Sequence, residues 1–362
     1  MRAARSLALA AAGLAAAILL LGWGSSDPRL PATVAAKTTP RQLAGLRIAT
    51  GFDGRKPPRR LKRMIARGEI GGVILFSDNV GGRDAVRRLA RRLQAIPRPA
   101  AVDEPLLIMV DQEGGLVRRL PGPPKPSAEE VGRRGARYAR KLGRATGEGL
   151  AEMGANVNLA PVLDVARPGG FIEAQHRAYG RTPGAVATIG SAFAAGMQSR
   201  GVAATAKHFP GLGAAGQSTD EQRVKLDLSR RTLRRRDEAP YEDYIEARGS
   251  LVMLSMAVYP ALGKGPAALS KRIAGRELRS RLGFEGVSIT DALDTPAAAA
   301  VGGTGNVARR AGRAGTDILL YNDLSQAARA SRALRRGIGR GALKRSGAER
   351  SAARILKLRR RL

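Results

Sequence analysis

Polar residues that could do chemistry stand where apolar runs of this sequence end. The run VAATAKHF closes on Lys207 and His208, and His208 is one of only two histidines in 362 residues. The run LLIMVD ends at Asp111, and GVSITDA contains Asp291 in a similar position. Carboxylates and cations act together when a fold brings them into one pocket, where they stabilise charge that develops on a substrate. These residues therefore require a fold that places the ends of their apolar runs side by side.

The types and spacing of these residues exclude several reaction classes. His176 and His208 are far apart, and neither has a second ligand three or four positions away, so no metal site is expected. No G-x-S-x-G motif supports a serine hydrolase, and the chain has no cysteine to supply a thiolate. Carboxylates suit an oxocarbenium-like transition state and cations donate to sugar hydroxyls, so glycoside chemistry fits best. The candidates for it are Asp111, Glu113, Arg119, Arg177, Lys207, His208 and Asp291.

The elements that must position these residues alternate regularly from residue 46 onward. Short apolar runs alternating with amphipathic stretches predict an α/β fold with a parallel sheet, and eight such units fit a closed (β/α)8 TIM-type barrel. A doubly wound open sheet is the alternative, but no G-x-G-x-x-G turn follows the first run, and no cofactor is expected. The predicted strands are 46–52, 71–76, 106–111, 155–161, 202–209, 251–258, 286–292 and 316–321. The predicted helices include 83–95, 135–152, 183–200, 271–281 and a pair between 325 and 361.

The barrel prediction gives the polar residues a common location. Asp111 ends the third predicted strand, Lys207 and His208 end the fifth, and Asp291 ends the seventh. In a (β/α)8 barrel the carboxyl ends of all strands share one rim, where side chains from different strands meet in one pocket. We therefore expect these four residues to line a single site.

Six segments of the chain resemble glycoside hydrolase family 3, in its single-barrel β-N-acetylhexosaminidase branch. They occur in the family's order, and KHFPG and DQEGG are specific signatures. The resemblance covers most of the chain from about residue 46 to 358, and it implies one catalytic barrel that acts through a covalent glycosyl-enzyme intermediate. The segments are LIMVDQEGGLVRRL (107–120), NVNLAPVLDV (156–165), IEAQHRAYG (172–180), GVAATAKHFPGLG (201–213), VMLSMAVYPAL (252–262) and LGFEGVSITDAL (282–293).

The resemblance also implies roles for individual residues. Asp291, in the SITDAL segment, would be the nucleophile that forms the intermediate. His176 precedes an arginine of the motif and matches nothing functional, so we interpret it as a loop residue. The residues implied to bind hydroxyls of the non-reducing sugar are Asp111, Arg119, Arg177, Lys207 and His208.

The loop after the fifth strand departs from the family pattern. In many members of the branch an Asp-x-His dyad there supplies the general acid/base, but its two positions fall on Ser218 and Asp220, so the histidine is absent. Asp220 or Glu221 is the candidate replacement, because a carboxyl in a closed pocket can hold a proton near neutral pH. Smaller departures are Leu212 and Met256, where histidines often stand, and Ala292, where a second aspartate often follows the nucleophile.

The N-terminal residues predict export and a domain boundary. Arginines at positions 2 and 5 precede an uncharged apolar run from about Leu7 to Trp23, which is typical of a signal peptide and also near the length of a membrane anchor. We expect residues 1–26 to be the signal peptide or anchor, 27–43 a linker and 44–362 the barrel domain. The protein is then exported, and it is either secreted or anchored to the cell membrane.

The net charge of the chain does not by itself identify its binding partners. Lysine and arginine number 63 against 30 acids, a net charge of +33, but the arginines are dispersed on helix faces and no nucleic-acid motif accompanies them. We expect a carbohydrate substrate, no specific nucleic acid, and an excess of cations that allows contact with a membrane or another anionic envelope surface. A sugar-binding barrel with impaired catalysis is the alternative to an enzyme, and no sequence feature points to an oligomeric state.

Overall fold

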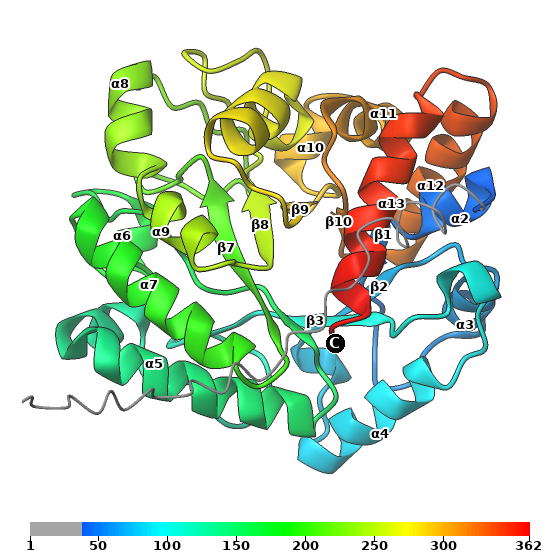
Figure 1. Cartoon of the computed structure of the whole chain (residues 1–362), viewed down its shortest axis with the longest axis horizontal. Coiled ribbons are helices and arrows are strands. Elements are labelled where there is room, and N and C mark those ends of the chain that lie inside the picture. The colour runs from blue at the N-terminus through cyan, green and yellow to red at the C-terminus, as the bar shows by residue number, and fades with distance from the viewer. Residues whose placement is uncertain (1–37) are drawn as a thin grey trace, which may run out of the picture.

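Eight parallel strands form one sheet that curves around the centre of the molecule (Figure 1). In the computed structural model, which describes residues 38–362, the strand order is β10-β1-β2-β3-β6-β7-β8-β9. The two outer strands of this order meet through the pair Ile289 and Ile318 and the hydrogen bond from Thr290 N to Ile318 O, which closes the ring. The strands are β1 (Ile48–Thr50), β2 (Gly72–Leu75), β3 (Leu107–Val110), β6 (Val157–Asn158), β7 (Ala203–Phe209), β8 (Leu251–Leu254), β9 (Val287–Thr290) and β10 (Leu319–Tyr321).

The predicted (β/α)8 barrel is confirmed, and each of its strands falls within one of the eight predicted runs. All residues of these strands are buried, because the barrel interior covers one face of the sheet and helices cover the other. The main covering helices are α3 (Arg59–Ala66), α4 (Arg83–Gln94), α5 (Ala128–Glu152), α7 (Pro183–Gln198), α9 (Pro240–Glu246), η5 (Arg272–Arg281), α11 (Thr304–Ala314), α12 (Leu324–Gly339) and α13 (Arg345–Arg359).

Two helices differ from their predicted form. Helix α5 begins seven residues earlier than predicted, at Ala128, because the Ser127 side chain caps it and Glu130 completes a capping box. Gly135, with φ 80°, interrupts its helical backbone near the predicted start, where a glycine tolerates a conformation that other residues avoid. Helix η5 occupies the range predicted for a helix but has π-helical hydrogen bonding.

The start of the domain differs from the predicted boundary at residue 44. Helix α2 (Pro40–Gly45) is capped by Thr39, and Leu43 is completely buried, so residues 38–43 belong to the barrel domain and not to the linker. A short capped helix that buries one apolar face against α12 carries too weak a periodic signal to be read from the sequence. The predicted signal peptide or anchor at 1–26 and the rest of the linker lie outside the described residues. Among residues 38–362, no helix combines the length and apolar character needed to cross a bilayer.

A small two-stranded hairpin extends the rim at the carboxyl end of β3. It consists of β4 (Gln112–Gly114) and β5 (Val117–Arg118), which pair antiparallel. The Gln112 side chain fixes the hairpin, because its oxygen accepts from the backbone N–H groups of Arg119 and Leu120 while its amide donates to Leu120 O. Residues of the DQEGG motif thereby acquire fixed positions at the rim.

Candidate active site

A cavity of about 600 Å³ opens at the carboxyl ends of the strands. It is the place where side chains from different strands of a (β/α)8 barrel converge. The structure places every predicted site residue on the wall of this cavity: Asp111, Arg119, Arg177, Lys207, His208, Asp220, Glu221 and Asp291. Residues that lie up to 180 positions apart in the chain, from Asp111 to Asp291, therefore share one site.

One wall of the cavity is a cluster of two carboxylates and two cations. Lys207 Nζ lies 2.6 Å from Asp111 Oδ1 and 2.6 Å from Glu113 Oε1. Arg177 contacts the same Glu113 in a bidentate manner, with Nε and Nη2 each donating over 2.8 Å. This planar pairing fixes both the position and the orientation of the guanidinium group. The cluster presents a rigid set of donors and acceptors to the cavity.

Glu113 holds this cluster together and was not among the predicted sugar-binding residues. Burial by itself raises the pKa of Glu113, but the charges and hydrogen bonds of Arg177 and Lys207 outweigh it and lower the pKa to about 2. Burial lowers the pKa of Lys207, yet Asp111 and Glu113 reverse this effect and raise it. Glu113 and Lys207 are therefore both charged at neutral pH. The DQEGG motif contained Glu113, but only its position between two cations shows its role.

His208 faces a buried carboxylate that the sequence analysis did not single out. Its Nδ1 lies 2.7 Å from Asp164 Oδ2, and Asp164 Oδ1 accepts from the backbone N–H groups of His208 and Leu212 at 3.2 and 2.6 Å. An ionised carboxylate only accepts hydrogen bonds, so Nδ1 carries the hydrogen and Nε2 is left for a ligand. Asp164 is fully buried just beyond the fourth strand. A carboxylate at the end of an apolar run was the available signal for it.

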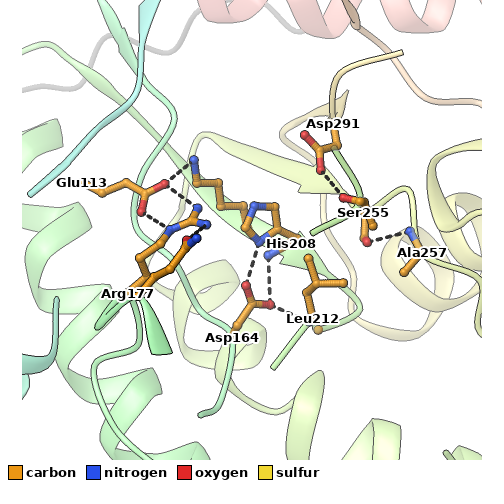
Figure 2. Close-up of polar contacts among 12 residues, drawn as sticks. Glu113, Asp164, Arg177, His208, Leu212, Ser255, Ala257 and Asp291 are labelled. Carbon is orange, nitrogen blue, oxygen red and sulfur yellow. Dashed lines mark hydrogen bonds and ion pairs between the residues drawn. The ribbon is translucent and has the colours of Figure 1, made fainter. Parts of the chain in front are cut away.

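Figure 2 shows His208 between the Glu113–Arg177 pair and Asp291. Asp291 follows the last residue of β9, and its backbone N–H donates to Leu254 O of the neighbouring β8 at 2.9 Å. Its Oδ1 accepts from the backbone N–H of Ala292 at 2.9 Å. The strand end and these bonds hold the Asp291 carboxylate in the cavity, opposite the cation cluster.

The loop after β7 reaches across the barrel to Asp291. Thr219 is buried, and its Oγ1 lies 3.3 Å from Asp291 Oδ2. The return of the loop is fixed by backbone hydrogen bonds of 2.9 Å that connect Val224 and Leu226 with Val258. Thr219 was not a predicted site residue, because a threonine in a polar loop gives no signal of its own.

Asp220 has the protonation behaviour of an acid that works near neutral pH. Its pKa is raised to about 6, first by the negative charge of Asp291 and second by burial, while His208 and Lys207 oppose the shift. Asp220 is exposed to solvent and still lines the cavity that Asp291 also lines, so the charge of Asp291 reaches it across the pocket. Ser218 Oγ accepts from the Asp220 backbone N–H at 3.1 Å and fixes the turn. Glu221 lines the same cavity from an exposed position.

The second histidine lies away from these groups. His176 is exposed, with φ 55°, and its Nδ1 lies 2.5 Å from Glu129 Oε2 at the start of α5. It is not part of the cavity wall, which agrees with its interpretation as a loop residue. Among the described residues, no group of three or more potential metal ligands comes together.

Comparison with known proteins identifies the family. The family profile described as the glycosyl hydrolase family 3 N-terminal domain matches residues 38–358. The chain is 41% identical, over 285 residues, to an uncharacterized secreted glycosyl hydrolase of Arthroderma benhamiae, covering 76% of this chain and 80% of that protein. It is 33% identical to a beta-hexosaminidase of Alkalilimnicola ehrlichii over 284 residues, which are 75% of this chain and 79% of that one.

Solved structures agree with this result. A glycoside hydrolase family 3 β-N-acetylglucosaminidase from Paenibacillus superposes with a TM-score of 0.85 at 33% identity, covering 90% of this chain and 62% of that one. A β-N-acetylhexosaminidase from Beutenbergia cavernae superposes with a TM-score of 0.83 at 30% identity, covering 90% of this chain and 99% of that one. This chain thus spans less than two thirds of the Paenibacillus protein and nearly the whole of the Beutenbergia protein. The profile match over almost all of residues 38–362, together with these relatives, shows that the chain belongs to glycosyl hydrolase family 3.

Proposed function

We propose that this protein is a retaining glycoside hydrolase that releases terminal β-linked N-acetylhexosamine from cell-wall-type or related glycans. One observation carries the proposal. Two carboxyl groups, Asp291 and Asp220, line one cavity, and the charge of the first raises the pKa of the second to about 6. A nucleophilic carboxylate beside a carboxylic acid is the pair that retaining glycosidases require. The printed names of the β-hexosaminidase relatives support the choice of sugar.

In this mechanism the two groups divide the chemistry. The Asp291 carboxylate attacks the anomeric carbon and forms the glycosyl-enzyme bond, while Asp220 gives its proton to the glycosidic oxygen, which leaves with the aglycone. In the second half-reaction Asp220, now ionised, removes a proton from water as the oxygen of that water attacks the anomeric carbon. The bond to Asp291 then breaks, and both carboxyl groups return to their starting states.

The cation cluster is proposed to hold the sugar. Lys207, Arg177 and Asp111 present charged donors and acceptors that suit neighbouring hydroxyl groups, and Glu113 keeps the two cations in place. Arg119, whose Nε is buried without a hydrogen-bond partner in the described structure, adds a further donor to the wall, and Nε2 of His208 adds an acceptor. A fixed set of directional groups favours one terminal residue over a long chain. The only tryptophan is Trp23, so none of residues 38–362 offers an indole surface for stacking along a polysaccharide.

The N-terminal residues support a proposal about where in the cell the protein acts. The positively charged start and the apolar run from Leu7 to Trp23 support export, with the protein secreted or anchored at the membrane. The relative from Arthroderma benhamiae is named as a secreted protein. Fractionation of cells that produce the full chain tests this location, and accumulation of the intact chain in the cytosol would contradict it.

The activity is tested with a panel of aryl β-glycosides that differ in the sugar. We expect N-acetylglucosaminides and N-acetylgalactosaminides to be hydrolysed faster than the corresponding glucosides and galactosides. A 2-fluoro-sugar inhibitor should form a covalent adduct, and peptide mapping should locate it on Asp291. Turnover of no member of the panel, together with saturable sugar binding, would favour the sugar-binding barrel instead.

A further inference from the structure

An arginine-lined groove of about 350 Å³ lies on the outside of the barrel, away from the catalytic cavity. Its walls come from helices α2, α3 and α12, which Figure 1 places together on one side of the molecule. We call it the arginine groove, and its six arginines are Arg41, Arg60, Arg63, Arg67, Arg332 and Arg335.

The positive charge of the arginine groove is balanced by only one acidic residue of its wall. Glu69 is its only acidic wall residue, and it lies 3.5 Å from Arg41. The other five arginines form no ion pair within residues 38–362 that the structure describes, and four of them are exposed. Like charges repel one another, so a concave cluster of unpaired guanidinium groups lowers its free energy when it binds an anion. The groove therefore has the properties of a binding surface for anionic groups.

The arginine groove and the catalytic cavity lie toward opposite ends of the barrel. Arg67 and Glu69 lie in the segment between α3 and β2, at the N-terminal end of that strand. Gly45 of α2 packs directly on Gly68 of this segment. The catalytic cavity lies at the carboxyl ends of the strands. Its wall carries five carboxyl groups and three permanent cations: Asp111, Glu113, Asp220, Glu221, Asp291, Arg119, Arg177 and Lys207. An anionic surface therefore attracts the end of the barrel that carries the arginine groove and does not attract the end that carries the catalytic cavity.

The start of the domain brings the arginine groove close to any N-terminal attachment. Arg41 of the groove lies three residues after Thr38, where the described chain begins. Residues 24–37 separate Thr38 from the apolar run that ends at Trp23, and 14 residues span at most about 50 Å. An apolar run held in a bilayer would therefore keep the groove within reach of the lipid headgroups.

We propose that the arginine groove docks the barrel on the anionic phospholipid headgroups of a membrane and leaves the catalytic cavity facing away from it. Headgroup phosphates fit a concave cluster of guanidinium groups, which donate paired hydrogen bonds to phosphate oxygens. The attraction falls off within a Debye length, so it orients a domain that is already close to the bilayer. Soluble anionic polymers are the competing ligands, and the experiments separate them from lipid.

The first experiment compares two triple variants of the full chain with identical loss of charge. Arg60→Gln/Arg63→Gln/Arg67→Gln removes three arginines of the groove from α3 and from the residue that caps its C-terminus, and we call it the α3 variant. Arg137→Gln/Arg140→Gln/Arg144→Gln removes three exposed arginines with the same spacing from α5, and it serves as the matched control. Each protein is mixed with vesicles of phosphatidylcholine, with and without phosphatidylglycerol. For each protein, the partition constant with phosphatidylglycerol is divided by the constant without it. Any apolar contribution of the N-terminal residues is present in both constants and cancels, so the ratio reports the electrostatic contribution.

The α3 variant is expected to lower this ratio roughly tenfold or more, because each cation near an anionic surface contributes roughly a fivefold preference. The α5 variant should leave the ratio close to that of the wild type, and added salt should reduce the wild-type ratio. Circular dichroism and hydrolysis of a soluble substrate should be unchanged in both variants. Equal losses in the two variants would show that net charge alone drives binding and would overturn the proposal. Loss of polyphosphate or duplex DNA binding in the α3 variant, with an unchanged vesicle ratio, would also overturn it.

The second experiment measures orientation directly. Because the chain has no cysteine, Ala66→Cys on α3 and Ala145→Cys on α5 each create a single labelling site at an exposed position. A fluorophore at residue 66 should be quenched more strongly than one at 145 by vesicles that carry a quencher on the headgroup and contain phosphatidylglycerol. Equal quenching at the two sites, or stronger quenching at 145, would contradict the proposed orientation.

Discussion

Thr219 Oγ1 lies 3.3 Å from Asp291 Oδ2, and this contact links the loop after β7 to the proposed nucleophile at the end of β9. Asp220 follows Thr219 directly, so the same contact limits how far its carboxyl group can move from Asp291. Asp220 and Asp291 line one cavity, and the charge of Asp291 is the largest contribution to the raised pKa of Asp220. The loop that lacks the family's usual histidine thus still places an acid in the cavity.

Asp291→Asn should abolish turnover and leave the fold intact. The change keeps the shape of the side chain and removes the charge that attacks the anomeric carbon, so kcat should fall on the order of 10⁴-fold or more. The pKa of Asp220 should also fall, because its largest raising influence is lost. Kinetics on an aryl glycoside and carboxyl carbon NMR measure the two effects. A variant that retains wild-type turnover would move the nucleophile to another residue of the cavity.

Asp220→Ala should discriminate between substrates by their leaving groups. A general acid matters most when the leaving oxygen is basic, so we expect a loss of roughly 10²-fold or more on a disaccharide and much less on a nitrophenyl glycoside. Added azide should partly restore cleavage of the nitrophenyl substrate, because azide attacks the intermediate without a base. Glu221→Ala is the matched control, since this neighbouring carboxyl group lines the same cavity. A larger loss of disaccharide cleavage in the Glu221 variant would identify Glu221, and not Asp220, as the general acid.

The pH profile of disaccharide cleavage should have a basic limb near pH 6. The raised pKa of Asp220, about 6, keeps its carboxyl group protonated below that pH and ionised above it. As an acid it acts only in the protonated form, so kcat/KM for a disaccharide should fall as the pH rises through about 6. The limb should disappear in Asp220→Ala. If it persists there at the same pH, another group supplies the proton.

Asp164→Asn should alter the tautomer of His208. The carboxylate accepts from Nδ1, whereas an amide that keeps its oxygen toward the two backbone N–H groups turns a donor toward the ring. Loss of this charged hydrogen bond costs about 1.5–3 kcal/mol, or roughly 10- to 100-fold in kcat/KM. Nitrogen NMR reports the tautomer, and His176→Asn simplifies the spectrum to one histidine. An unchanged tautomer would show that Asp164 does not position the ring.

Glu113→Gln should lower the free energy of unfolding at pH 7 and make that free energy change less between pH 7 and pH 3. The pKa of Glu113 is depressed from 4.5 to about 2 in the folded chain, so its contribution is present above about 4.5 and is lost as the pH falls toward 2. Removing the carboxylate leaves two buried cations partly uncompensated, and the free energy of unfolding should fall by about 3 kcal/mol at pH 7. Denaturant unfolding at pH 7 and pH 3 measures both values. Glu221→Gln, an exposed change in the same cavity, should leave the free energy of unfolding nearly unchanged.

The sequence by itself determined the barrel and the residues on the wall of its cavity. Each strand is a short buried run whose pattern is local, and eight such runs alternating with helices allow few other architectures. Asp111, Lys207, His208 and Asp291 lie at or next to the ends of such runs, so the topology alone sends them to one rim. The family motifs added Arg119 and Arg177, and the loop positions added Asp220 and Glu221.

Only the tertiary structure decided how these residues act on one another. Glu113 lies between Lys207 and Arg177, and Asp164 faces His208, through contacts between residues 44 to 94 positions apart, which no local pattern encodes. The pKa of Asp220 depends on its distance from Asp291 through space, and that distance is set by how the loop folds over the rim. The arginine groove likewise collects residues from α2, α3 and α12 that the sequence shows only as scattered charges. Electrostatic interactions depend on distance in space, so folding had to bring these charges together before their effect could be assigned.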